Sequence, residues 1–344
     1  ERLFRNYLYF SSFSQTMLKH AEVLSGRLID SRNLSADSLV VEVASNDGYL
    51  LQYYHKDGIP VLGIEPALNI ARVAEGKGIR TISEFFGNEL ANRLVLDGIK
   101  ADVIHANNVL AHVADLPGVA EGMAILLKPG GVAVIEVPYV RKMIENVEFD
   151  TIYHEHLCYF SLTALDRLFR QHKLQVQDVE QLAIHGGSLR VYVSAIGEVV
   201  GDSVTSLLLA EKSCGMNDVE FYRDFGQRVS ELGVKLKSLL SELKSQGKSI
   251  AAYGASAKGS TLLNYLGIGA ETLDFVVDRS TVKQGMYTSG NHLPIYDPAM
   301  LIEKTPDYVL LLTWNFAEEI LEQQAQYRNL GGKFIIPIPE PVVI

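Results

Sequence analysis

Two spacings of apolar residues alternate along this chain, and their alternation predicts its architecture. Residues 38–44 (SLVVEVA) form a continuous apolar run, which is typical of a strand buried on both faces of a parallel sheet. The loop SNDG follows, and the sequence then changes to helical spacing over residues 48–54. Further strand-like runs occur at 60–64, 101–105 and 131–137, separated by helical stretches at 67–77, 87–96 and 116–127. This order predicts an α/β fold with a doubly wound parallel sheet, whose ligands bind beyond the carboxyl ends of the strands.

The pattern changes after residue 160. A helix is expected at 162–172, followed by strands at 174–182 and 188–195 around the turn His185-Gly186-Gly187. This hairpin would extend the first sheet antiparallel at its edge. Residues 202–246 carry no strand signal, and their heptad-like apolar spacing predicts one long helix ending at Gly247.

A second αβ unit begins at Lys248, where SIAAYGASAKGSTLLNYL reads as a strand, a Gly-rich turn and a helix. Further strands are expected at 273–277, 308–312 and 333–336. A chain of 344 residues is about twice the usual domain length, which favours two domains. The predicted organisation is a first domain over 1–200, a helical connector over 201–247 and a smaller C-terminal domain over 248–344.

Charge and composition narrow the classes of function. The net charge is −10 and no run of Lys or Arg exceeds two residues, so nucleic acid is not an expected partner. No apolar run approaches the ~20 residues that span a bilayer, and the first residues do not form a signal peptide, so a cytoplasmic protein without membrane contact is expected. Two cysteines are too few for a disulfide framework or a four-cysteine zinc site.

The first strand ends in a loop that is suited to a nucleotide-like ligand. Small residues there allow a ligand to approach the backbone, and the candidate ligand-binding positions are Glu42, Ala44, Ser45, Asn46, Asp47 and Gly48. One glycine is too few for the GxGxxG fingerprint of dinucleotide enzymes. After the second strand, Glu65-Pro66 places a carboxylate where it could accept hydrogen bonds from ribose hydroxyls. Together these features suit S-adenosylmethionine better than NAD, although an ordinary turn with a solvated Glu65 would give the same pattern.

Asn107, Asn108 and His112 follow the strand that begins at Ala101. In a methyltransferase-like sheet this loop faces the methionine moiety and the reacting methyl group. Polar residues within an apolar stretch are costly to bury without partners, which favours a functional role. For His112, a hydrogen-bonded structural histidine is an equally good interpretation.

The densest group of titratable residues lies at 150–156 (DTIYHEH), just beyond the last parallel strand. Tyr153, Glu155 and His156 could supply a base that titrates near neutrality, an acid that orients it and a donor for an enolate oxygen. This is the chemistry of proton abstraction next to a carbonyl. His154 and His156 could instead bind a metal, but a helical zinc site requires His residues four apart, so we expect no metal. A purely structural cluster is the remaining alternative.

Five segments, in order along nearly the whole chain, resemble one enzyme family: EVASNDGYLL, GIEP, NNVLAHV, YHEHLCYFS and YGASAKGSTLLNY. The family is the sugar C-methyltransferases, which act on nucleotide-linked 4-keto-deoxysugars in antibiotic and cell-surface sugar pathways. The resemblance implies a class I methyltransferase Rossmann-like sheet followed by a smaller Rossmann-like domain. It also implies S-adenosylmethionine as cofactor.

The resemblance further implies roles for individual residues. His156 would remove the proton beside the keto group, with Glu155 and Tyr153 orienting base and substrate. A tyrosine of the lead-in segment, best matched by Tyr7 with Tyr9 close by, would also enter the active site, as would His112. In the C-terminal domain, Ser256 and Lys258 would lie near the diphosphate of the nucleotide-sugar, although an empty Rossmann-like loop would have the same sequence.

One departure from the family is large, because its members usually begin with a cysteine-rich zinc module and no CxxC motif occurs here. This departure bears on sugar recognition more than on methyl transfer, because the module would lie beside the nucleotide of the substrate. Rival interpretations are a nicotinamide-dependent oxidoreductase that uses YGASAKG, a methyltransferase with a non-sugar substrate, and a non-catalytic binding protein.

Overall fold

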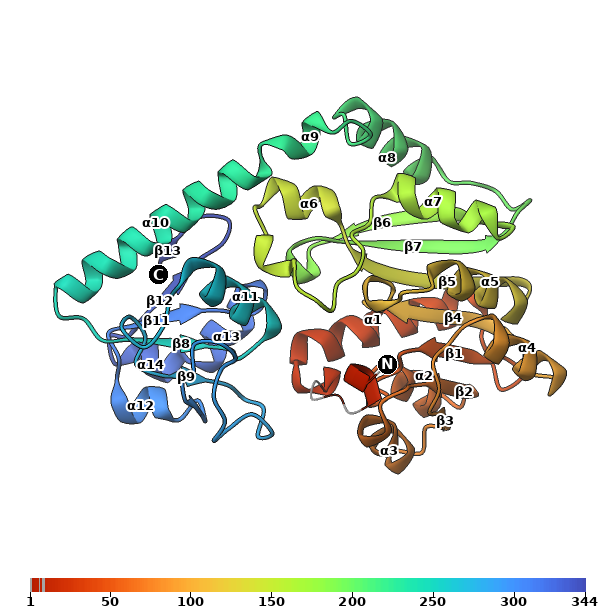
Figure 1. The fold of residues 1–344 in the computed structure, drawn as a ribbon. Coiled ribbons are helices and arrows are strands. Elements are labelled where there is room, and N and C mark those ends of the chain that lie inside the picture. The colour runs from red at the N-terminus through yellow and green to blue at the C-terminus, as the bar shows by residue number, and fades with distance from the viewer. Residues whose placement is uncertain (1, 6, 8–9) are drawn as a thin grey trace. The chain divides into compact units, whose positions relative to one another are not determined.

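A computed structural model describes residues 2–5, 7 and 10–344 (Figure 1). Tyr9, the neighbour of the predicted active-site Tyr7, lies outside the described residues. The chain divides into two compact units. Unit 1 comprises the chain up to Tyr139, together with Leu157–Ala183 and Gly187–Cys214, and unit 2 comprises Val140–His156, Ile184–Gly186 and Gly215–Ile344.

This division differs from the predicted boundaries 1–200, 201–247 and 248–344. Unit 2 includes residues 140–156, which the prediction placed in the first domain. Packing explains the difference, because Val147 and Phe149 belong to the same buried apolar cluster as Leu236 and Leu262 of unit 2. The segment that carries Tyr153 and His156 is therefore built on the C-terminal unit.

Unit 1 contains a seven-stranded sheet in the order β3-β2-β1-β4-β5-β7-β6. Its strands are β1 (Val40–Val43), β2 (Val61–Ile64), β3 (Thr81–Ile82), β4 (Ala101–Asn107), β5 (Leu127–Pro138), β6 (Leu174–Leu182) and β7 (Ser188–Ala195). Strands β1 to β5 pair in parallel, whereas β7 is antiparallel to both β5 and β6. The predicted doubly wound sheet with an antiparallel edge hairpin is confirmed.

The helices of unit 1 are η1 (Arg2–Arg5), η2 (Ser11–Phe13), α1 (Gln15–Arg32), α2 (Leu51–Lys56), α3 (Leu68–Gly76), α4 (Asn88–Leu96), η3 (Leu110–His112), α5 (Leu116–Leu126), α7 (Leu162–Gln171) and α8 (Asp202–Ser213). Right-handed crossovers from β1 to β3, and then from β3 back to β5, place α2 and α3 on one face and α4 and α5 on the other. Helix α1 contacts α2, while α5 contacts both α4 and α7. Both faces of the parallel sheet are thus covered (Figure 1).

Unit 2 contains a second, six-stranded sheet in the order β10-β9-β8-β11-β12-β13. Its strands are β8 (Ile250–Tyr253), β9 (Val276–Val277), β10 (Ile295–Tyr296), β11 (Tyr308–Leu311), β12 (Lys333–Ile336) and β13 (Val342–Val343). All pair in parallel except β13, which is antiparallel to β12. Alternate residues of β8 enter two different apolar clusters, Ile250 and Ala252 in one and Ala251 and Tyr253 in the other, so each face of this sheet has its own core.

The helices of unit 2 are α6 (Val140–Glu145), η4 (Phe149–Thr151), η5 (Ile184–Gly186), α9 (Glu220–Arg223), α10 (Phe225–Ser245), α11 (Ala257–Leu266), α12 (Met300–Lys304), η6 (Trp314–Phe316), α13 (Ala317–Gln323) and α14 (Ala325–Asn329). The prediction of one helix over 202–246 is wrong. Helix α8 ends at Ser213, Gly215 adopts a φ of 80°, and α10 starts only at Phe225. The heptad-like spacing belongs to α10 alone, and the left-handed Gly215 ends the continuity.

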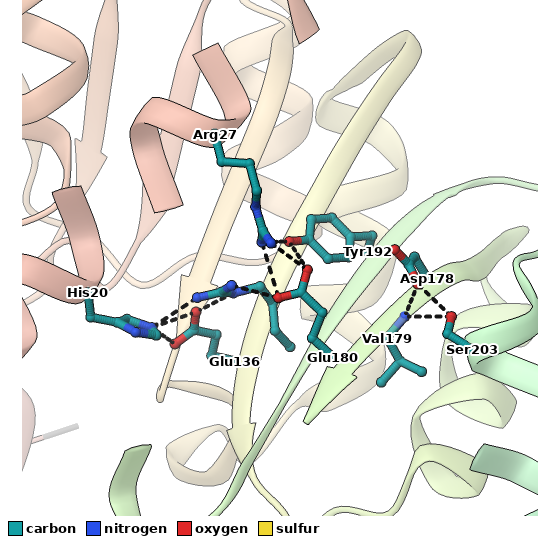
Figure 2. Close-up of polar contacts among 9 residues, drawn as sticks. His20, Arg27, Glu136, Asp178, Val179, Glu180, Tyr192 and Ser203 are labelled. Carbon is teal, nitrogen blue, oxygen red and sulfur yellow. Dashed lines mark hydrogen bonds and ion pairs between the residues drawn. The ribbon is translucent and has the colours of Figure 1, made fainter. Parts of the chain in front are cut away.

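A buried ionic network holds α1 to the sheet of unit 1 (Figure 2). Glu136 of β5 is 1% exposed and accepts hydrogen bonds from His20 Nε2 of α1 at 2.9 Å and from Arg190 Nε of β7 at 2.6 Å. Arg190 also pairs with Glu180 of β6, to which Arg27 of α1 donates. Burial opposes ionisation of Glu136, but the His20 hydrogen bond and the Arg190 charge outweigh it and lower its pKa.

Among the described residues, no helix is both long and apolar enough to cross a membrane.

Candidate active site

The loop after β1 has an unusual backbone. Ala44, Asn46 and Gly48 all have positive φ angles, of 54°, 49° and 76°. At Gly48 the positive φ favours glycine, and a Cβ atom there would also lie 2.4 Å from Ile79 Cδ1, so the Ile79 side chain would have to move. Strain of this kind at non-glycine residues is typical of functional loops.

Glu65 fastens this loop to the end of β2. Its Oε2 accepts a hydrogen bond from the Asn46 backbone N–H at 2.9 Å, and its Oε1 accepts one from Ala67 N–H at 2.8 Å. Pro66 has no N–H, so Ala67 supplies the first amide after Glu65. The side chain is buried rather than solvated, and this burial, opposed by the two amides, raises its pKa. Each carboxylate oxygen keeps a second lone pair for a ligand.

Of the buried oxygens without a hydrogen-bond partner among the described residues, five lie at or near the ends of β1 and β4. They are Glu42 Oε2, Ser45 Oγ, Asp47 Oδ1, Asn107 Oδ1 and Asn108 Oδ1. An unsatisfied buried polar atom costs about 1–3 kcal/mol, so such a cluster is most simply explained by a ligand that brings donors. Burial, reinforced by Glu65, Asp47 and Glu136, raises the pKa of Glu42 well above its usual range.

His105, which sequence reasoning did not select, lies within β4 and is fully buried. Its Nε2 is 2.8 Å from the hydroxyl of Tyr54 in α2. Burial lowers the pKa of His105 to about 3, so the ring is neutral. The only signal in the sequence is a histidine within an apolar strand.

The lead-in segment contacts several of these loops. Asn69 of α3 pairs with the backbone of Tyr7, accepting from Tyr7 N at 3.1 Å and donating to Tyr7 O at 2.7 Å. Ser11 N donates to Asn46 Oδ1 at 2.9 Å, and Ser12 Oγ donates to Asp47.

His112 also meets the lead-in segment, because its ring centroid lies 5.7 Å from that of Phe4 in an edge arrangement. Unit 1 therefore brings the predicted cofactor residues, Tyr7 and His112 to neighbouring loops.

Unit 2 fixes the orientation of His156. His156 Nδ1 is 2.9 Å from the carbonyl oxygen of Thr151, which can only accept, so Nδ1 carries the proton. In the neutral ring Nε2 is then the nitrogen that can accept a proton, and it faces the Tyr153 hydroxyl at 3.0 Å. The ring centroids of Tyr153 and His156 are 4.2 Å apart. Nε2 of His156 is thus presented as a base, next to a phenol that can donate.

Glu155 lies 3.9 Å from Nε2 of His154, whose side chain is 74% exposed. The described residues contain no group of three His, Cys, Asp or Glu side chains placed to hold a metal ion.

Ser256 and Lys258 lie at the start of α11, but both have local contacts. Ser256 Oγ accepts from Gly259 N at 3.0 Å and caps the helix. Lys258 Nζ lies 4.7 Å above the ring of Trp314. Capping explains Ser256 without a ligand, whereas a cation over an aromatic ring keeps donors for one.

Comparison with known proteins places the chain in a family. Residues 19–179 match a methyltransferase domain, and residues 183–339 match a C-methyltransferase C-terminal domain. C-methyltransferase NovU from Streptomyces niveus is 36% identical over 344 residues, covering 99% of this chain and 82% of NovU. The chain belongs to the C-methyltransferase family. The predicted carbon methyltransferase is confirmed at this level, in preference to the oxidoreductase and the binding protein.

Solved structures with a similar fold cover about half of this C-methyltransferase. PH0226 protein from Pyrococcus horikoshii is 15% identical, with a TM-score of 0.45, and covers 57% of this chain and 99% of that one. An S-adenosylmethionine-dependent methyltransferase from Clostridium acetobutylicum is 12% identical, with a TM-score of 0.42, and covers 52% and 92%.

Proposed function

We propose that the enzyme transfers a methyl group to the carbon next to the ketone of a nucleotide-linked 4-keto-deoxysugar, through an enolate and with His156 as base. The observation that carries this proposal is the fixed tautomer of His156, whose Nδ1 proton is accepted by the Thr151 carbonyl and whose Nε2 nitrogen faces the Tyr153 hydroxyl at 3.0 Å. A carbon acid next to a ketone needs such a pair, a base near neutral pH and a donor for the oxyanion.

S-adenosylmethionine is the methyl donor of this enzyme. The buried oxygens of Glu42, Ser45, Asp47, Asn107 and Asn108 fit the ammonium and hydroxyl donors that this molecule carries. The lone pairs left on Glu65 fit its ribose hydroxyls. When bound, S-adenosylmethionine supplies an electrophilic methyl group on a sulfonium and becomes S-adenosylhomocysteine.

The residues of this chain then have distinct tasks. His156 Nε2 takes the proton of the carbon beside the ketone, and the electron pair of that C–H bond passes into the enolate. Tyr153 donates its hydroxyl hydrogen bond to the enolate oxygen, and Glu155 helps to orient the substrate. The enolate carbon would form the new bond to the methyl group while the bond from that methyl group to the sulfonium breaks and its electron pair stays on sulfur. Tyr7 and His112 are proposed to shape the sugar site near the donor methyl.

Lys258 is proposed to contact the diphosphate of the nucleotide, with Ser256 beside it. An ammonium above an aromatic ring keeps its charge and its N–H donors, so it can still donate to phosphate oxygens. Uridine diphosphate and thymidine diphosphate are suitable probes. In Lys258→Ala we expect about tenfold weaker binding or more, because a charge-assisted hydrogen bond contributes ~1.5–3 kcal/mol. Lys248→Ala, which removes a half-exposed lysine paired with Asp307, is the matched control, and equal affinities in both variants would contradict this role.

His156→Ala tests the base. Turnover should fall by about 10²–10⁴-fold, the usual contribution of a positioned general base, while S-adenosylmethionine affinity stays unchanged. Exchange of the substrate's α-proton with deuterated water, measured without a methyl donor, should fall in parallel.

His154→Ala is the matched control for this experiment, because it removes an exposed imidazole two residues away. Parental exchange in His156→Ala would show that another residue is the base, with His112 the next candidate. A methylated product from a ketone that carries no nucleotide, made as fast as from a nucleotide-sugar, would instead indicate a non-sugar substrate.

A further inference from the structure

We propose that Trp314 and Asp150 form a positioning pair that holds the His156 segment in its reactive geometry. The inference rests on the proposed function, since it concerns how the base is held rather than which residue is the base. Both residues belong to unit 2.

The pair is a short, buried hydrogen bond between elements far apart in the sequence. Trp314 Nε1 of η6 donates to Asp150 Oδ2 of η4 at 2.7 Å. Asp150 is 0% exposed and Trp314 is 9% exposed. A hydrogen bond to a buried carboxylate is among the stronger polar contacts in proteins, because water cannot replace it.

Asp150 is linked to His156, the proposed base, through the adjacent residue Thr151. The next residue, Thr151, provides the carbonyl that accepts the Nδ1 proton of His156 at 2.9 Å. The backbone N–H of His156 donates to Tyr153 O at 3.0 Å, and Ile152 N donates to Phe149 O at 2.9 Å. The segment is therefore a series of local turns, and a shift at Asp150 would move the atom that sets the His156 tautomer.

Apolar packing and charge also hold the Asp150 turn in place beside Trp314. Phe149 is buried and its ring centroid lies 5.2 Å from that of Tyr265 in α11. Lys258 Nζ lies 4.7 Å from the centroid of the Trp314 ring, the ring that donates the hydrogen bond to Asp150. Burial raises the pKa of Asp150, and the Lys258 charge and the Trp314 hydrogen bond oppose this rise. The group proposed to meet the diphosphate thus also stabilises the pair that orients the base.

Three substitutions separate the hydrogen bond from the charge. Trp314→Phe keeps an aromatic ring but removes the donor, and Asp150→Ala removes the acceptor. Asp150→Asn keeps an acceptor oxygen and removes the charge. We expect kcat and α-proton exchange to fall about 10- to 100-fold in Trp314→Phe and Asp150→Ala, since a misplacement near 1 Å costs about 10²-fold. Asp150→Asn should stay within about threefold of the parent, and KM and S-adenosylmethionine affinity should be unchanged in all three.

Tyr327→Phe is the matched control, because it removes another buried aromatic donor of unit 2, the hydroxyl that bonds Pro306 O at 2.7 Å. It should lower the melting temperature about as much as Trp314→Phe while keeping kcat. If Trp314→Phe and Tyr327→Phe have equal kcat, the positioning pair is wrong. If His156→Ala exchanges the α-proton at the parental rate, His156 is not the base. If His156→Ala loses exchange but Trp314→Phe keeps the parental rate, His156 remains the proposed base and the Trp314–Asp150 pair does not position it.

Fluorescence keeps the test decisive where a variant folds poorly. Trp314 is the only tryptophan of the chain, so the emission reports on the surroundings of this one indole, which include Asp150 and Lys258. Asp150→Ala should change the emission maximum and the quenching by acrylamide, whereas Asp150→Asn and Tyr327→Phe should not. Unchanged emission in a folded Asp150→Ala would overturn the pair.

Discussion

The two units share one arrangement of hydrogen bonds at the carboxyl ends of their strands, in which one acidic side chain accepts from two backbone amides; we call it the latch. In unit 1, Glu65 accepts amide hydrogen bonds from Asn46, in the loop after β1, and from Ala67, two residues further on. In unit 2, Asp278 accepts from Ala255, in the loop after β8, and from Ser280, again two residues further on, both at 2.7 Å. An acid after the second strand thus fastens the loop after the first strand in each case.

The two latches differ in whether a cationic side chain lies beside the acid. Lys283 Nζ lies 3.6 Å from Asp278 and donates to Ala255 O at 2.9 Å, so the latch of unit 2 is closed by its own cation. No ion pair to Glu65 occurs among the described residues. An acid without a cation beside it keeps lone pairs for a ligand's hydroxyl groups, which supports the proposal that the cofactor ribose binds to Glu65 in unit 1.

The buried acids differ in the same way. Glu136 of unit 1 is ion-paired with Arg190, and its pKa is lowered. Asp150 of unit 2 is held by an indole N–H, and its pKa is raised. The two acids should therefore affect stability with opposite dependence on pH.

The largest expected effect is on the network of Glu136. Glu136→Gln leaves Arg190 with Glu180 alone, and breaking a buried pair by removing one partner costs about 3–5 kcal/mol, so we expect ~3 kcal/mol in urea unfolding near neutral pH. Because the folded pKa is below 4.5, this stabilisation exists above pH 4.5 and disappears as the pH falls through the folded value.

Asp166→Asn is the control for that measurement. It breaks the exposed pair with Arg170 in the same unit and should cost less than about 1 kcal/mol. Equal losses in the two variants would mean that the buried network does not anchor α1.

The next effect tests the two latches directly. Glu65→Ala should weaken S-adenosylmethionine binding by about 1–3 kcal/mol in calorimetry, since hydrogen bonds to a charged acceptor are lost. Asp278→Ala removes the same two types of amide bond in unit 2 and should leave this affinity unchanged. If both variants, or neither, lose affinity, the cofactor assignment to the unit 1 latch is incorrect.

A smaller effect, of opposite sign, is expected for Asp150→Asn. The folded pKa of Asp150 is above 3.8, so the parent loses stability as the pH rises from 3.8 through that raised value. The variant has no such titration. Urea midpoints should therefore favour Asp150→Asn increasingly as the pH rises, and a constant difference between pH 3 and 8 would contradict the raised pKa.

The smallest expected effect concerns limited proteolysis, in which we expect the two fragments to stay associated after the chain is cut. Limited proteolysis should cut the turn at 214–219, between α8 and α9, rather than at Gly247, which follows α10 directly. The fragments should still elute together in gel filtration, because Val147 and Phe149 pack in the core of unit 2. Separation without denaturant would show that residues 140–156 are not part of that core.

Most strands and helices of both units can be predicted from the sequence. Burial on one or both faces determines which of their positions are apolar, so each element has a recognisable apolar pattern. Strands β1, β2, β4 and β5 and the edge hairpin lie where the apolar runs predict them. The two-residue strands β3, β10 and β13 are too short to give a pattern of their own, whereas β9 lies within the strand expected at 273–277. The break at Gly215 was missed because one glycine in a polar stretch carries little signal.

Most candidate residues were selected because strand ends in a parallel sheet meet at one edge, and their roles stay predictions. The contacts among them could not be predicted, since they join distant positions: Asn69 with Tyr7, Trp314 with Asp150, and Glu136 with His20. Nor does the sequence reveal that the Thr151 carbonyl selects the tautomer of His156, because a backbone group has no residue type.

The interleaving of the two units limits how such enzymes can be recombined. A chimaera joined near residue 200 or 248 would keep the YHEH motif of one parent and give it the α11 and η6 of another. Phe149, Asp150 and their partners Tyr265 and Trp314 would then come from different parents. An exchange of the C-terminal unit between relatives should therefore carry residues 140–156 and 184–186 together with everything after 214.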